Sequence, residues 1–283
     1  MAKIRGSVAY KAFVKNKAGL FGAVVVALIV IFGIFAPLLA PYDPTAQDIP
    51  NRLAKPSIDH PLGTDQYGRD ILSRLIYGAR ISLVVGILSV LIGILIGVIL
   101  GLVAGYSGGF IDLLICKIID VLMSFPMLLL AMAIVAILGT SLVNSILAVG
   151  ISSIPRFARL TRGQVLVLKN TEFIDAVRAL GSNPVRIVFL HLLPNIVSPI
   201  IIMGTLYIAT AIIMESNLSF LGLGVQPPTA TWGGMISDGR AFLRSSPWVS
   251  TIPGIAIALS VLAFNMLGDG LRDALDPKLK DEQ

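Results

Sequence analysis

Long apolar runs, separated by polar segments of unequal length, dominate the chain. A membrane-spanning helix needs roughly 20 apolar residues, so these runs predict an all-α, polytopic membrane protein. Six runs meet or approach that length, and the fourth is the weakest because Pro155 and Arg156 cut it short. The predicted spans cover about residues 19–39, 81–106, 118–138, 141–160, 194–214 and 251–267.

Composition agrees with this class. Of the 283 residues, 55% are apolar and only 13% are charged, which is too little charge to cover a soluble protein of this size. The first apolar run is too long for the core of a signal peptide and more spans follow it, so we expect an uncleaved first helix. One cysteine and two histidines exclude an internal disulfide framework and leave little for a zinc site.

The distribution of positive charge predicts the orientation. With the N-terminus inside, 15 of the 22 Lys and Arg residues fall in inner segments and 7 in outer ones, as the positive-inside rule requires. The net charge of +6 therefore indicates cytoplasmic loops and no nucleic-acid partner. We expect a multi-pass protein of a bacterial-type cell membrane with both termini in the cytoplasm. Its predicted parts are a tail (1–18), the first helix (19–40), an outer loop (41–80), a five-helix core (81–270) with inner loop 161–193 and outer loop 215–250, and a tail (271–283).

Outer loop 41–80 contains the segment LGTDQYGRD at residues 62–70. Gly63 and Gly68 permit tight turns there, and Asp65 and Arg69 can form a local ion pair. Asp70 is a suitable N-cap for a helix that begins at the next residue. We expect either a self-folded outer cap or a rim that a substrate-binding protein contacts.

Inner loop 161–193 contains a polar helix within this apolar chain. Phe173, Val177 and Leu180 recur at helical spacing and predict one apolar stripe. This stripe either fills a groove on a partner or packs onto the membrane helices. The charged residues Glu172, Asp175 and Arg178 fall off it.

A break and a second helix are expected after this segment. Gly181 can take the left-handed conformation that ends a helix. Asn183 is a good N-cap and Pro184 suits the first helical position, so a second short helix is predicted to run to about Leu192, before Pro194. Two short amphipathic helices would then form a compact knob, or would lie in the lipid interface.

The inner loop resembles a known motif. Residues 175–177 read Asp-Ala-Val, Gly181 follows after three residues, and Leu-Pro stands at 193–194. This resembles the EAA loop of importer-type ABC permeases: Glu-Ala-Ala, three residues, Gly, nine residues, Ile, one residue, Leu-Pro. The departures are Asp for Glu, Val for the second Ala, and His191 for Ile. The segments HPLGTDQYGRDILSRLIYGARISL (60–83), SFLGLGVQPPTATWGGMI (219–236) and AFNMLGDGLRDALDPKLK (263–280) resemble the second permease of dipeptide and oligopeptide importers.

This resemblance covers almost the whole chain and implies a six-helix, type I ABC importer permease fold. It implies a permease subunit that forms half of the translocation path for dipeptides or oligopeptides. The implied partners are a homologous second permease, two cytoplasmic ABC ATPase subunits and an extracytoplasmic substrate-binding protein. The inner loop would dock into a groove on the ATPase. The residues implied in this coupling are Glu172, Phe173, Asp175, Ala176, Val177, Arg178, Leu180 and Gly181.

The chain contains no phosphate-binding loop of the G-x-x-x-x-G-K-[ST] type and no Gly-Lys dipeptide. We therefore expect no catalytic residue, metal or cofactor in this chain, and ATP with Mg²⁺ bound by the partner ATPase subunits. The two histidines cannot form one site, because His60 is predicted outside and His191 inside.

Polar residues within or beside the spans are candidates for a translocation path, since such groups turn towards a bundle interior or a wet cavity. Asp120 follows Lys117 by three residues, so the two are predicted to neutralise each other. The same machinery importing nickel or another small solute is an alternative, as is an ion-driven secondary transporter. The latter would show repeated halves and charged residues at mid-membrane. The candidate path residues are Ser124, Asn144, Ser152, Glu215 and Asn217.

Overall fold

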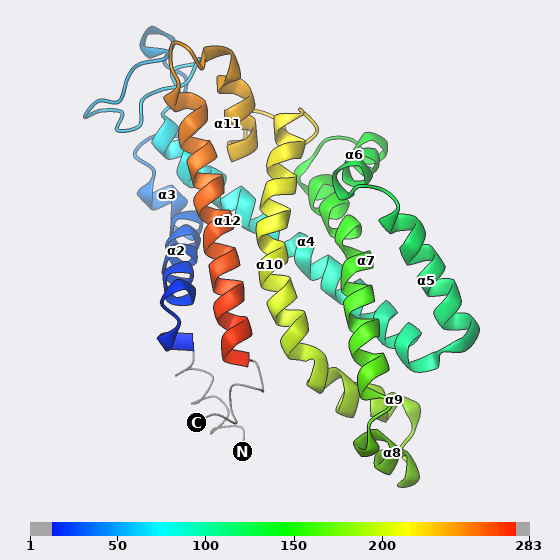
Figure 1. The fold of residues 1–283 in the computed structure, drawn as a ribbon. Coiled ribbons are helices and arrows are strands. Elements are labelled where there is room, and N and C mark those ends of the chain that lie inside the picture. The colour runs from blue at the N-terminus through cyan, green and yellow to red at the C-terminus, as the bar shows by residue number, and fades with distance from the viewer. Residues whose placement is uncertain (1–12, 276–283) are drawn as a thin grey trace.

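Long apolar helices form the body of the molecule in the computed structural model, which describes residues 13–275 (Figure 1). The five longest are α2 (Lys17–Ile34), α4 (Ile71–Ser107), α7 (Leu142–Leu168), α10 (Leu193–Phe220) and α12 (Trp248–Leu275). No strand occurs within these described residues, in agreement with the predicted all-α class. Most of tail 1–18 and of tail 271–283 lies outside the described residues.

Four helical segments are long and apolar enough to cross a membrane: α2, α4, residues 184–220 and α12. A fifth crossing results if α5 (Gly109–Met123) and α6 (Met127–Leu138) count as one bent span. α7 is long enough to cross a membrane, with 27 residues, but it is not apolar enough to be counted among these segments. Its inner half carries Arg156, Arg159 and Arg162, which lower the hydropathy of a helix otherwise long enough.

The third predicted span, 118–138, is not one straight helix. α5 begins earlier, at Gly109, and ends at Met123, and the chain then turns by 90° into α6. Pro126 precedes α6 in an extended conformation with ψ of 133°. Proline has no N–H to continue the hydrogen-bond ladder of α5, so the helix breaks where the apolar pattern continues.

The second span begins ten residues earlier than predicted and absorbs the expected outer helix. α4 is continuous over 37 residues from Ile71. Asp70 caps its start as predicted, because the carboxylate accepts a hydrogen bond of 2.7 Å from the N–H of Ser73. The outer loop is thereby confined to about residues 41–70. The short helix α3 (Ala36–Leu39) precedes this loop, and η1 (Ile49–Asn51) lies within it.

A row of glycines brings α4 and α7 into close contact. Gly93, Gly97, Gly101 and Gly105 recur every four residues along one face of α4 and meet α7. A Cβ atom on Gly101 would lie 2.6 Å from the carbonyl oxygen of Ala158. Small residues at this spacing let two membrane helices approach backbone to backbone. This contact fixes the orientation of α7, whose opposite face carries the arginines.

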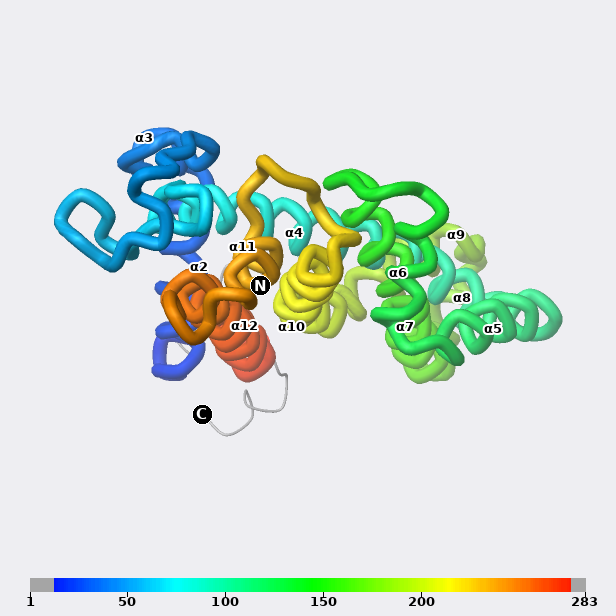
Figure 2. Tube along the Cα trace, turned by 90° about the horizontal axis from the view of Figure 1, so that it is seen from above, coloured from blue at the N-terminus to red at the C-terminus, as the bar shows by residue number. Residues whose placement is uncertain are grey.

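Seen from above, α4 runs along one side of the other long helices and joins two groups (Figure 2). α2 and α12 pack together on one side, and α6 and α7 pack together on the other. α10 lies between the groups and contacts α4, α7 and α12. The core is correspondingly divided into clusters, of which one surrounds Phe157 and Tyr207 and another surrounds Phe264 and Trp232.

The outer loops form a folded cap. Arg69 bonds to Asp65 at 2.6 Å, with both side chains almost fully buried, and also contacts Asp238 of α11 (Trp232–Gly239) at 3.3 Å. Trp232 donates a hydrogen bond of 2.9 Å to the carbonyl oxygen of Leu75. The predicted Asp65–Arg69 pair is therefore present, and it links the first outer loop to the second, where η3 (Arg240–Phe242) follows α11.

Candidate functional site

The inner loop protrudes from the end of the molecule where α2 begins and α12 ends (Figure 1). It consists of α8 (Glu172–Ala179), a turn, α9 (Pro184–Arg186) and the π-helix η2 (Ile187–Leu192), which leads into α10. Its attachment to the bundle starts where α7 ends, because the Lys169 ammonium donates a hydrogen bond of 2.7 Å to the carbonyl oxygen of Gly105.

The charges of α8 follow the direction of its dipole. Glu172 and Asp175 lie in the first turn and Arg178 in the last, which stabilises the partial charges at both ends of a short helix. Asp175 and Arg178 form an exposed ion pair at 3.0 Å. Exposed pairs of this kind contribute at most about 1 kcal/mol, so these charges remain available to a partner.

One face of α8 packs onto the bundle, and it differs from the predicted stripe. Ile174 and Val177 are buried in a cluster with residues of α4, α7 and α10. Of the predicted stripe only Val177 belongs to this face, because α8 ends at Ala179 and Leu180 lies beyond it as the C-cap. The three-residue spacing of Ile174 and Val177 was the sequence signal for the true face.

Gly181 closes α8 as predicted. Its φ is +79°, the left-handed region that residues with a Cβ rarely adopt. Its N–H donates to the carbonyl of Arg178 at 2.9 Å, and the N–H of Ser182 donates to that of Val177 at 3.4 Å. These two bonds form a Schellman motif, which satisfies the last carbonyls of the helix and sets the direction of the chain after it.

The second half of the loop is not a separate short helix. Asn183 caps it as predicted, because its side-chain oxygen accepts a hydrogen bond of 2.8 Å from the N–H of Arg186, and Pro184 is the first helical residue. The helix then passes through η2 and Pro194 without a break into α10. A π-turn accommodates the missing N–H of Pro194, since its hydrogen bonds reach one residue further back. The result is one helix over residues 184–220.

The protrusion also exposes apolar side chains. Leu180 is 86% exposed and Phe173 is 53% exposed. Phe173 also meets His191 edge-on, with ring centroids 5.6 Å apart, so α8 and η2 support each other at this surface. We call the exposed apolar set the tip. It consists of Phe173, Leu180, Val185, Phe189 and Leu190.

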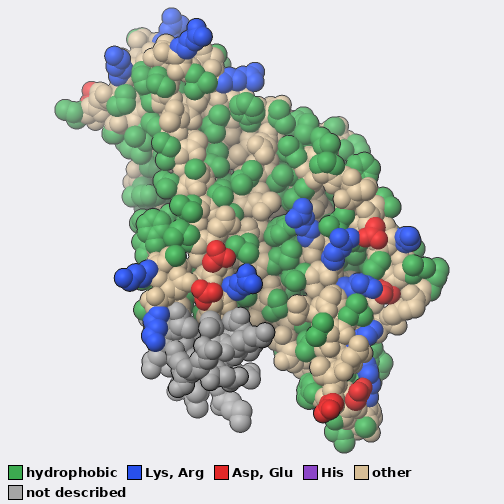
Figure 3. Space-filling model, in the orientation of Figure 1, with side chains coloured by type: hydrophobic (Ala, Val, Ile, Leu, Met, Phe, Trp, Pro, Cys, Tyr) green, Lys and Arg blue, Asp and Glu red, His purple; other side chains and the backbone are tan. Residues whose placement is uncertain are grey.

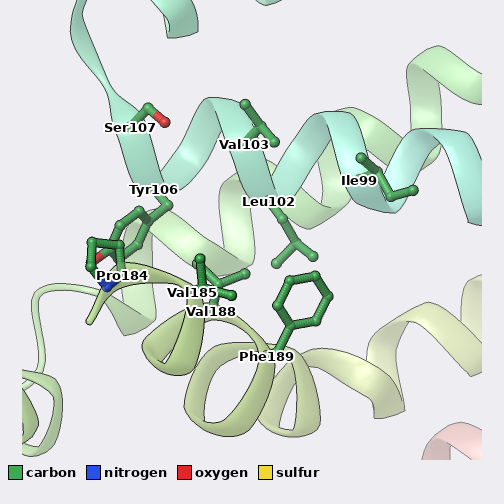
Figure 4. Close-up of a pocket in the computed structure, with 9 residues that line it drawn as sticks. All are labelled: Ile99, Leu102, Val103, Tyr106, Ser107, Pro184, Val185, Val188 and Phe189. Carbon is green, nitrogen blue, oxygen red and sulfur yellow. The ribbon is translucent and has the colours of Figure 1, made fainter. Parts of the chain in front are cut away.

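An apolar pocket of about 230 Å³ lies between the inner end of α4 and the start of the long helix (Figure 4). Leu102 of α4 points towards Val188 and Phe189 across it, and Pro184 faces Tyr106. Few polar groups line this space, so the two elements meet there only through apolar contacts. The protrusion is therefore packed onto the bundle through α8 and through Ile187 and Leu192 of η2, and the pocket lies beside this packed cluster.

Two ion pairs join α5 to α7, and Figure 3 shows basic and acidic side chains gathered over the region of these two helices. Arg162 holds Asp112 with two hydrogen bonds of 2.6 and 2.7 Å. Asp120 bonds to Arg159 at 2.6 Å and not to Lys117, so the predicted Lys117–Asp120 pair is wrong. Because α7 runs alongside α5, its residue Arg159 is better placed to pair with Asp120 than Lys117 of α5 itself.

The predicted path residues occupy separate places. Ser124 lies at the break after α5 and Ser152 is buried in α7, each donating to a carbonyl of its own helix. Asn144 donates to the carbonyls of Leu138 and Gly139 and so joins α6 to α7. No hydrogen bond within residues 13–275 joins any two of the five, and their place on a path stays a prediction. Glu215 is fully buried and accepts from Ser219 at 2.7 Å, while Asn217 is half-buried in α10.

Comparison with known proteins decides the family. The model described as binding-protein-dependent transport system inner membrane component matches residues 93–281. The chain belongs to this family. The model described as N-terminal TM domain of oligopeptide transport permease C also matches, over residues 6–56. This inner membrane component is thus a transport subunit and not an enzyme, as the sequence predicted.

Curated relatives resemble this inner membrane component over nearly all of its length. A dipeptide transport system permease protein of Alkalihalophilus pseudofirmus is 49% identical over 272 residues, covering 96% of this chain and 90% of the relative. A glutathione transport system permease protein of Shigella flexneri is 50% identical with the same coverage. A di/tripeptide transport system permease protein of Pseudomonas aeruginosa is 46% identical over 278 residues, covering 96% of this chain and 92% of the relative.

A solved structure supports the fold of this inner membrane component. A chain of the MetNI methionine ABC transporter in an inward-facing conformation aligns with a TM-score of 0.59 at 20% identity, covering 72% of this chain and 97% of that chain. The fold is therefore that of a type I ABC importer permease.

Proposed function

We propose that this chain is the permease subunit of an ATP-driven peptide importer and forms half of its translocation path. The observation that carries the proposal is the protrusion: a helix packed on the bundle by Ile174 and Val177, ended by a Gly181 turn, with an exposed apolar tip. An inner membrane component of a binding-protein-dependent system needs a contact with its energy source. A rigid element with unsatisfied apolar surface on the inner side provides it.

The partners follow from this role. The tip would insert into a groove on a cytoplasmic ABC ATPase, and a second, homologous permease would supply the other wall of the path. An extracytoplasmic binding protein would deliver the cargo to the outer cap. Peptides are the favoured cargo because relatives with near-identical length and about half of their residues in common are named for dipeptides and glutathione. Their names do not favour nickel, the alternative considered from sequence.

In this proposal the chain crosses the membrane six times with both termini inside. α5 and α6 together form one bent crossing, and α7 crosses despite Arg156, Arg159 and Arg162. Two of these arginines are paired with acidic residues of α5, which lowers the cost of placing them at membrane depth. The tight α4–α7 contact keeps the arginines on the side away from α4.

Reconstituted transport tests the cargo and the energy source. The complex with the sister permease, both ATPases and the binding protein is placed in liposomes, and uptake of a radiolabelled dipeptide is measured. We expect uptake that requires ATP and every subunit. Uptake that proceeds without the ATPases and follows an imposed proton or sodium gradient would instead identify a secondary transporter.

An acidic residue at the tip tests the docking surface. We expect Leu180→Asp combined with Phe173→Asp to lower ATP-dependent uptake at least about tenfold, because a desolvated apolar contact of two side chains is worth roughly 1.5–3 kcal/mol each. Less ATPase should also copurify with the variant. Thermal stability of the permease alone should fall only slightly, since Leu180 is largely exposed and Phe173 loses only its edge-on contact with His191.

The matched control is Ile58→Asp, which introduces the same charge at an outer-loop side chain that is 99% exposed. Copurification of the ATPase should be unaffected in this variant. Normal ATPase binding by the double tip variant would show that docking uses another surface.

A further inference from the structure

Two polar side chains, Arg156 and Tyr207, meet halfway through the molecule with no acidic residue between them. Arg156 stands near the middle of α7, and Tyr207 stands near the middle of α10. At 1.5 Å per residue each lies roughly 20 Å from either end of its helix. The guanidinium carbon of Arg156 is 5.9 Å from the centre of the Tyr207 ring, so the two side chains face one another across the helix contact.

Neither side chain is paired with a carboxylate within residues 13–275. The Tyr207 side chain is 9% exposed, its hydroxyl is buried, and the hydroxyl has no hydrogen-bond partner. Arg156 is exposed and forms no ion pair with an acidic residue of the described part of the chain. The ring of Phe157 holds Tyr207 in place, with centroids 5.2 Å apart. The guanidinium has only donors, and the hydroxyl has one donor to offer, so the two side chains together can take up an anionic acceptor.

The charges around Arg156 are already matched. Arg159 is paired with Asp120 and Arg162 with Asp112, so the acidic groups of α5 are occupied. Arg156 is left as the cation of this face that has no partner on α5. A free arginine at the centre of a bilayer faces a wet cavity or a partner and not lipid.

From these contacts we propose that Arg156 and Tyr207 form a transient carboxylate site on the wall of the translocation path, which takes the C-terminal or side-chain carboxylate of a passing peptide. The inference rests on the proposed importer function. Arginine binds a carboxylate through two parallel hydrogen bonds, and the tyrosine hydroxyl can donate a third. We expect the affinity of this site for a carboxylate to be low, because the path must also release the peptide that it binds.

Charge reversal at Arg156 tests the site in the complete reconstituted importer. The probes are the dipeptides Ala-Glu and Ala-Lys, each first shown to bind the binding protein. The same binding protein is used with wild type and variants, so its own preference for one dipeptide affects every uptake ratio equally. We expect Arg156→Glu to lower the Ala-Glu to Ala-Lys uptake ratio by about tenfold or more, which corresponds to a difference of about 1.4 kcal/mol. Arg156→Lys should keep the ratio within about threefold, because the positive charge remains.

Three further variants make the result specific. Lys117→Glu makes the same charge change at an exposed cation of α5 and should leave the ratio nearly unchanged. Arg156→Gln replaces the reversal if Arg156→Glu fails to assemble, and should lower the ratio in the same direction. Tyr207→Phe should weaken Ala-Glu uptake about threefold by removing only the hydroxyl.

An unchanged ratio in Arg156→Glu, or an equal shift in Lys117→Glu, would overturn the site in favour of structural or diffuse electrostatic effects. These outcomes are distinguishable from failure of the proposed function, in which the wild-type complex itself would show no ATP-dependent uptake of either dipeptide.

Discussion

Replacing Gly101 with alanine is expected to lower the amount of folded permease several-fold. The new Cβ would lie 2.6 Å from both the carbonyl oxygen of Ala158 and the Cβ of Thr161, and 3.0 Å from the backbone nitrogen of Arg162. Backbone atoms cannot move aside as a flexible side chain can, so α4 and α7 must separate. Overpacking of this kind costs about 1–3 kcal/mol, enough to change abundance several-fold. The measurement is the yield of monodisperse protein from detergent-solubilised membranes.

The control for this prediction is Gly163→Ala in α7. No atom lies within 4 Å of a Cβ built there, so the substitution adds the same methyl group to the same helix pair without a clash. Alanine also favours the helix by about 1 kcal/mol over glycine. We expect a yield equal to or above wild type. Equal losses in both variants would mean that the glycine row is not what holds α4 against α7.

Replacing Gly181 with valine is expected to reduce ATP-dependent uptake at least about tenfold while the protein still inserts and folds. Nothing lies within 4 Å of a Cβ at this position, so no steric clash with neighbours is involved. The cost is the φ of +79°, which a β-branched residue adopts only with strain of about 1–3 kcal/mol. The turn would open and the tip would lose its orientation. Uptake and ATPase rate are measured together on the reconstituted complex.

Asparagine at the same position provides the comparison, because it tolerates the left-handed conformation better than other residues with a Cβ. We expect Gly181→Asn to retain most of the uptake and Gly181→Ala to fall between the two. If valine transported as well as asparagine, the backbone geometry of the turn would have no part in coupling.

Local signals in the sequence predicted local structure well. Asp70, Gly181, Asn183 and Pro184 each occupy the capping or turn position expected of them, because such positions depend on a few adjacent backbone groups. The apolar runs also located the long helices. Every long helix of a membrane protein needs an apolar surface, whichever helices lie beside it.

Features that depend on a neighbouring helix were harder to predict. Pro194 was expected to end a helix, but a π-turn carries the helix through it. Lys117 was the obvious partner of Asp120 along the chain, whereas the actual partner, Arg159, comes from α7. The glycine row on α4 was readable as a four-residue repeat, and its meaning became clear only with α7 beside it.

The candidate path illustrates the same difference. The five polar residues chosen from sequence are mostly bonded within or next to their own helices. The arginines of α7 were counted only as inner-loop charge, because Pro155 and Arg156 interrupt the fourth apolar run. Extending that helix to Leu168 moves Arg156 to its middle and changes the meaning of the charge.

The continuous helix from Pro184 to Phe220 also has a mechanical consequence. It is about 55 Å long at 1.5 Å per residue, and its midsection is wedged among α4, α7 and α12. We expect this helix to pivot as a rigid body about its midsection, so that a sideways displacement of the tip moves the opposite end of the helix in the other direction. A single movement of the partner ATPase would then widen the translocation path on one side of the membrane and narrow it on the other side.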